Sequence, residues 1–160
     1  EGGKDPITFG EGQANPFDAT IKENGHYYDE STGRFVIEFE TPVKTIKKKA
    51  FYKTEIETIE LPDGLETIEE SGLGGMWRLK EITIPGSVNT IGVNAFEVCY
   101  ALEKITFLPS PTKTPLNIAY LIDEVWNEYG PFYYSKLTSK VCINYVISVH
   151  FRCRFFNYFN

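Results

Sequence analysis

An apolar phrase recurs along this chain at a nearly fixed interval. Ile59, Ile82 and Ile105 each open a short alternating stretch that ends in proline, and both intervals between them are 23 residues. A period of this size indicates a repeat architecture, in which one unit is too small to bury its apolar face and must stack on its neighbours. The chain is therefore expected to form a solenoid, an architecture that presents an extended surface.

The repeat places apolar residues in columns that should stack from one unit to the next. The first pair of columns reads Ile37, Ile59, Ile82, Ile105 and Phe39, Leu61, Ile84, Phe107. A second pair reads Val43, Leu65, Val88 and Ile46, Ile68, Ile91. Such columns are typical of parallel strands that bury one face against the interior of a solenoid. We therefore predict a mainly β solenoid of about three repeats with short helical turns.

Each unit also has a corner in which a small residue precedes a large one. The corners are Ala50-Phe51, Gly72-Leu73 and Ala95-Phe96. The second is glycine-rich and runs to Met76, so a looser helical turn is expected there, because glycine costs about 1 kcal/mol in a helix. The free energy gained by burying the apolar residues of one unit is about equal to the entropic cost of ordering that unit. Contacts between stacked units therefore decide whether they fold.

The regions on either side of the repeats divide the chain into three parts. Residues 1–24 are expected to be an irregular lead-in. A hairpin of 25–28 with 35–39 opens the solenoid, which spans 25–109. Residues 110–160 are expected to form a C-terminal cap and tail, with a short amphipathic helix over 116–128 and an aromatic plug that includes Phe132.

The tail alternates apolar and polar residues from Val141 to Phe155. One interpretation is a terminal strand or hairpin that covers the end of the solenoid. A second is self-association, with residues 141–155 pairing with another copy of the chain. A third is a disordered or atypical tail. A disulfide between Cys142 and Cys153 requires the tail to fold back, which the sequence does not decide.

Charge and residue types exclude several classes of function. All 22 acidic residues lie at or before Glu128, so residues 1–128 carry 12 − 22 = −10 and residues 129–160 carry +4. An acidic body argues against nucleic-acid binding. No apolar run is long enough to cross a membrane. Three cysteines without a CxxC and two histidines argue against a metal, and no catalytic motif is present, so neither a cofactor nor enzymatic activity is expected.

One repeat unit carries a family resemblance. The stretch Gly86-Ser-Val-Asn-Thr-Ile-Gly92, followed by Ala95-Phe96, Cys99, Leu102 and Ile105-Thr-Phe107, resembles the BspA-type leucine-rich repeat of Bacteroides-type bacteria. The resemblance covers about residues 25–109. It implies a right-handed solenoid on a secreted or cell-surface bacterial protein, of a kind associated with adhesion to host matrix proteins or other bacteria.

The predicted outward face of the sheet supplies the first candidate partner-binding residues. They are Glu38, Glu60, Thr83 and Thr106, flanked by Glu81 and Lys104. The alternative is that these are ordinary solubilising residues of a β surface. Trp77 and Tyr100, 23 residues apart, are expected to stack on neighbouring units, either as exposed anchors or as filling for the edge of the repeat.

Two functions follow from these candidates. The main prediction is a non-catalytic interaction module that binds a protein partner through the sheet face and the edge aromatics. The alternative is a carbohydrate-binding module in which Trp77, Tyr100 or Trp126 offers a stacking platform. A third possibility is a structural fragment whose role is presentation or self-assembly.

Overall fold

The computed structural model describes residues 7–112, 116–118, 121–122, 128–129, 132 and 141–143. In these ranges the regular structure is mainly β, and the one helix is the 3-10 turn η1 at Gly10–Gly12. The strands are β1 (Ile21–Asp29), β2 (Arg34–Phe39), β3 (Thr45–Ile46), β4 (Thr67–Ile68), β5 (Glu81–Ile84), β6 (Thr90–Ile91), β7 (Lys104–Phe107), β8 (Asn117–Ile118), β9 (Leu121–Ile122), β10 (Glu128–Tyr129) and β11 (Val141–Ile143). The predicted mainly β class is confirmed.

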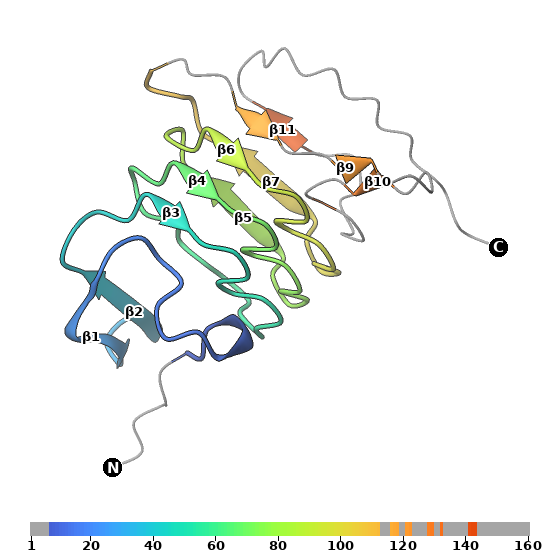
Figure 1. The fold of residues 1–160 in the computed structure, drawn as a ribbon. Helices are drawn as coiled ribbons and strands as arrows, with labels where there is room; N and C mark the ends of the chain where they lie inside the picture. Colours follow the sequence, from blue (N-terminus) through green and yellow to red (C-terminus); the bar gives the residue numbers. More distant parts are fainter. Residues whose placement is uncertain are drawn as a thin grey trace.

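Two parallel sheets stack the repeated segments on one another (Figure 1). In the four-stranded sheet, ordered β3-β4-β6-β8, Ile46 pairs with Ile68 and Ile68 with Ile91. In the three-stranded sheet, ordered β11-β7-β5, Ile82 pairs with Ile105. Residues one period apart are therefore direct neighbours at these positions, as the columns predicted.

Backbone hydrogen bonds also join the corners of successive segments. The Phe51 amide donates to the Gly72 carbonyl at 2.8 Å, and the Leu73 amide donates to the Ala95 carbonyl at 2.9 Å. Since these bonds join residues 21 and 22 positions apart, the corners of all three segments stack in the same register as the strands. The glycine-rich second corner keeps this pattern, so the looser helical turn expected there was wrong.

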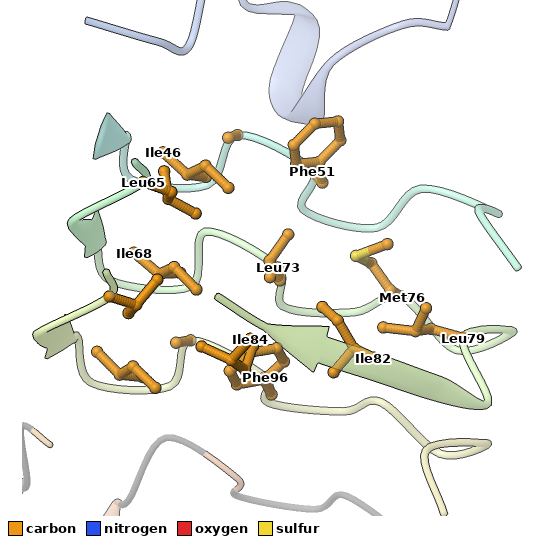
Figure 2. Packing of buried hydrophobic residues seen from close by; sticks show 14 of the residues in the cluster. Ile46, Phe51, Leu65, Ile68, Leu73, Met76, Leu79, Ile82, Ile84 and Phe96 are labelled. Carbon is orange, nitrogen blue, oxygen red and sulfur yellow. The ribbon is translucent and has the colours of Figure 1, made fainter. Parts of the chain in front are cut away.

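The core lies between the two sheets and the corners. Figure 2 shows Ile46, Ile68, Leu73 and Phe96 among the side chains directed into this interior. Leu65, Ile68, Leu73, Met76, Leu79, Ile91, Ala95, Phe96, Cys99, Leu102 and Ile105 are all fully buried. Because these residues come from different segments, burial of any one segment depends on its neighbours.

Each corner contains two residues with left-handed backbone, four positions apart. The first position is held by Lys49, Ser71 and Asn94 and the second by Lys53, Gly75 and Val98, with φ between 52° and 69°. Left-handed backbone suits glycine and is strained for a β-branched residue. Only Gly75 of the six meets this requirement without a Cβ, and Val98 carries the greatest strain.

The column that was predicted to run from Ile37 to Ile105 is interrupted in the first repeat segment. Ile59 and Ile37 pack against the core and are partly buried, but residues 58–61 form no strand and β2 pairs only with β1 in the described chain. Within that part of the chain, no backbone hydrogen bond joins residues 55–61, here called the open segment, to any other residue. The prediction of one continuous ladder was therefore wrong at its first two rungs.

A missing residue explains the interruption. Gly75 to Leu79 is four positions, whereas the equivalent Lys53 to Ile56 is three. In the second and third segments this stretch contains a buried residue, Met76 or Cys99, whose carbonyl accepts from the amide of Leu79 or Leu102. The first segment has no such buried residue and no such turn. The stretch that leads into its open segment is therefore one residue shorter than in the other two segments.

Residues before the hairpin cap the first repeat segment. Phe9 and Phe17 are buried against Phe51, with ring centroids 5.9 Å and 5.8 Å from it. The Asp18 carboxylate accepts the backbone amides of Lys44 and Thr45, each at 3.0 Å, and thereby covers the edge of β3. The predicted lead-in is thus part of the packed structure, and β1 begins at Ile21, earlier than the predicted hairpin.

The C-terminal region continues both sheets. β8 extends the four-stranded sheet beside β6, and β11 pairs in parallel with β7. β9 and β10 form an antiparallel pair, so the helix predicted over 116–128 was wrong where the chain is described. The terminal-strand interpretation of the tail is confirmed for 141–143, and residues 144–160 lie outside the described residues. Phe132 stacks on Phe96 at 5.4 Å, as expected of a plug.

Candidate interaction surfaces

The paired strands β5 and β7 present one polar face. Along both strands buried residues alternate with more exposed ones, because successive side chains point to opposite sides. The pairing places Glu81 beside Lys104 and Thr83 beside Thr106, and the Lys104 ammonium lies 3.6 Å from the Glu81 carboxylate. Four of the predicted partner-binding residues are therefore brought together on one face.

Glu38 and Glu60 do not join that face. The Glu38 carboxylate accepts from the Lys22 ammonium at 3.2 Å and from the Tyr27 hydroxyl at 3.1 Å, and Lys22 holds the pKa of Glu38 below its usual range. Glu60 forms an exposed ion pair with Arg34 of β2. The prediction that both extend the sheet face was wrong, because β2 pairs back on β1 and the open segment does not pair with β5.

Trp77 and Tyr100 occupy equivalent turns, each four residues before a strand. Trp77 is 37% exposed and Tyr100 is 57% exposed, and among the described residues neither ring stacks on another aromatic ring. The two side chains are thus exposed, as one of the two alternatives predicted, but they do not stack on each other. Trp126, the third aromatic of the predicted carbohydrate platform, lies outside the described residues.

A wide groove, not predicted from the sequence, lies between β2 and the open segment. Its volume is 1630 Å³. Its apolar lining comes from Phe35, Ile37, Phe39, Ile56, Ile59 and Leu61. Carboxylates on its margin are those of Glu11, Asp29, Glu55, Glu57 and Glu60, against the cations of Arg34 and Lys53. The missing residue before Ile56 was the sequence signal that would have located it.

Ion pairs link equivalent positions of neighbouring segments. Lys44 pairs with Glu66 at 2.8 Å and Lys48 with Glu70 at 2.9 Å, in each case across 22 residues. These side chains are exposed, so each pair contributes less than about 1 kcal/mol. Both pairs place opposite charges at matched positions of neighbouring segments.

Burial shifts the pKa values of Cys99 and His26. Burial raises the pKa of the Cys99 thiol to about 11, and its sulfur donates to the Leu73 carbonyl at 3.3 Å. Burial lowers the pKa of His26, whose ring stacks on Phe9 at 5.2 Å. The described residues contain no group of three or more side chains suited to a metal ion.

Comparison with known families identifies the repeat. The family model described as BspA type leucine rich repeat region matches residues 20–118, in six copies.

The chain belongs to the BspA-type leucine-rich repeat family.

One solved structure resembles this leucine-rich repeat chain, the crystal structure of the pneumococcal vaccine antigen PcpA. The two are 35% identical over 52% of this chain and 22% of the antigen, with a TM-score of 0.40. The leucine-rich repeat chain thus spans less than a quarter of that antigen's length. No curated protein matched. In the described part of the chain, no helix is both long and apolar enough to span a bilayer.

Proposed function

We propose that the chain is a right-handed leucine-rich repeat solenoid, with about three full repeats and an N-terminal hairpin, that binds a protein partner and has no catalytic role. The observation that carries this proposal is the polar face of β5 and β7. The face holds two matched pairs on parallel strands, Glu81 with Lys104 and Thr83 with Thr106. A partner strand or loop laid across this face meets both charges and two hydroxyl groups at once.

The exposed aromatics support the same proposal. Trp77 and Tyr100 are exposed in the turns just before the two strands that carry the polar face. Protein interfaces commonly combine such aromatic anchors with a polar surround, and aromatic residues supply much of the binding free energy. Membership of the leucine-rich repeat family favours protein partners, and host matrix proteins are the class to test first.

A binding measurement with matched variants tests the face. Immobilised matrix proteins are probed with the unaltered chain and with the variant Thr83→Lys/Thr106→Lys. We expect at least about tenfold weaker binding of the variant, equivalent to about 1.4 kcal/mol, because two long cations then stand beside Lys104. The control is Thr67→Lys/Thr90→Lys, which changes a pair of neighbouring threonines in the four-stranded sheet. Equal binding by both variants removes this face from the proposal.

A carbohydrate-binding module is the second candidate, because Trp77 and Tyr100 offer two exposed rings on neighbouring segments. Sugar rings stack on such aromatic faces. Tryptophan fluorescence titrated with bacterial and host polysaccharides tests it, with Trp77→Phe separating the signal of Trp77 from that of Trp126. An unchanged spectrum across the polysaccharides counts against this candidate.

We also propose that the protein is secreted or displayed on a bacterial surface, as its family membership suggests. Fractionation of the source cells with a specific antiserum tests the compartment. Recovery of the protein only inside the cell overturns this part of the proposal.

A further inference from the structure

Two backbone edges face each other across the groove without strand partners there. β2 is bonded along one edge to β1, and the described chain supplies no strand for its other edge. Opposite it, the open segment makes no backbone hydrogen bond within the described residues. Unpaired edges of this kind are templates for an added strand, which satisfies the free amides and carbonyls.

The groove between these edges defines what kind of strand fits. Its floor is apolar, with Phe35, Ile37 and Ile59 among the lining residues. Its margin carries five carboxylates against two cations, and three of the carboxylates also pair with Lys49 or Arg78 just outside the lining, so the margin keeps a net negative charge. The complementary strand therefore alternates apolar residues, directed into the groove, with basic or neutral polar residues on the other side, and it carries no acidic residues.

The tail of the chain itself has this composition. From Val141 to Phe155 apolar residues recur at every second position, and His150, Arg152 and Arg154 alternate with them. Residues 129–160 contain four basic and no acidic residues. We infer that the groove of one copy binds the tail segment 144–155 of a second copy as an added β-strand.

The two ends of the chain are positioned for this exchange. β11, from which the segment continues, lies beside β7 at one end of the stack, whereas β2, which lines the groove, lies at the other end (Figure 1). A tail that enters the next copy's groove makes a head-to-tail contact, which propagates into chains or closes into rings. This inference concerns a surface distinct from the polar face of β5 and β7, so either can fail without the other.

Light scattering on the full chain measures the association, with reductant present so that Cys142 and Cys153 form no crosslink. We expect the average mass to rise with concentration from 18.3 kDa to at least twice that value. The groove variant Glu55→Lys/Glu60→Lys and the tail variant Arg152→Glu/Arg154→Glu each place like charges in contact. Both are expected to stay at 18.3 kDa over the same concentrations.

Mixing the two variants is the decisive experiment. The intact tail of the groove variant fits the intact groove of the tail variant, and the substituted acidic tail faces the substituted basic groove, so the mixture is expected to regain an average mass that rises with concentration above 18.3 kDa. The variant Glu66→Lys/Glu70→Lys makes the same change of net charge outside the groove and is expected to associate like the unaltered chain.

Three results overturn the inference. A chain that stays monomeric at every concentration shows that the tail does not enter a second copy, even if it occupies its own groove. Association that survives in the groove variant shows that the tail uses another surface. Loss of association in the Glu66/Glu70 variant shows that the effect is one of net charge alone.

Discussion

Residues 58–61 and 81–84 carry closely similar phrases, Thr-Ile-Glu-Leu and Glu-Ile-Thr-Ile, at equivalent places in the repeat. The second phrase forms β5 and bonds to β7, whereas the first forms no strand and bonds to neither neighbour in the described chain. Both phrases direct isoleucine toward the core. The difference teaches that apolar pattern brings a segment to the core, while the length of the preceding turn decides whether it enters the ladder.

The largest expected effect comes from comparing the two isoleucines. Ile82 is 3% exposed, so Ile82→Ala should lower the free energy of unfolding by about 2–5 kcal/mol. Ile59 is only partly buried beside the groove, and Ile59→Ala should cost about 1 kcal/mol. Urea denaturation of both variants measures the difference. Equal losses would mean that the open segment is packed as tightly as β5.

Restoring the missing residue should close the ladder. A methionine inserted between Lys53 and Thr54 supplies the position held by Met76 and Cys99, so the open segment gains the reach to pair with β5. Two or three new backbone hydrogen bonds should stabilise the fold by about 2 kcal/mol. Hydrogen exchange should show new protection at residues 58–61. The control inserts the same methionine between Ser31 and Thr32 in the exposed hairpin turn. New protection of residues 58–61 in the control protein alone would contradict the explanation.

The left-handed corner positions give a smaller effect in the closed part of the molecule. Val98 has a φ of 57°, so Val98→Gly should raise the free energy of unfolding by about 1 kcal/mol through relief of strain. The reverse change, Gly75→Val, should destabilise, because a Cβ there lies 3.0 Å from the Lys53 amide nitrogen. Thermal denaturation compares the two. A destabilised Val98→Gly protein would show that the valine side chain matters more than its backbone.

The smallest expected effect is a pH dependence at the open end. Burial lowers the pKa of His26 from 6.5, and its Nε2 has no hydrogen-bond partner in the described structure. The unfolded chain therefore binds a proton more readily, so the stability contributed by neutral His26 is complete above pH 6.5 and is lost as the pH falls below it. His26→Phe should keep the ring stacked on Phe9 and remove this loss. Parallel pH profiles of stability for the two proteins would exclude His26 as the cause.

The repeat register was predictable because it depends on residue spacing and burial. The pairing of Ile82 with Ile105, the isoleucine stack of the four-stranded sheet and the buried corners all follow from apolar residues at intervals of 22 or 23. The break at Ile59 was not predicted, because alignment of the strand phrases conceals a deletion in the turn before them. The groove was missed for the same reason.

The candidate face was predicted in part. Glu81, Thr83, Lys104 and Thr106 were assigned correctly to one side of paired strands, since alternation along a strand fixes which side chains point outward. Glu38 was misplaced, because alternation does not reveal that β2 pairs back on β1 instead of joining the stack. The capping role of Phe9 and Phe17 was missed, since a lead-in without periodicity gives no signal of where it packs.

The two ends of the molecule are covered by elements unlike the repeat, the aromatic lead-in before β3 and the strands β8 and β11 after β6 and β7. Each cover touches one neighbouring segment, so it is indifferent to how many segments lie beyond. A duplicated cassette of 23 residues inserted between the second and third segments would meet familiar surfaces above and below. The protein can thus lengthen in evolution by whole units. The loss of a single turn residue, in contrast, leaves the strand segment that follows it unpaired.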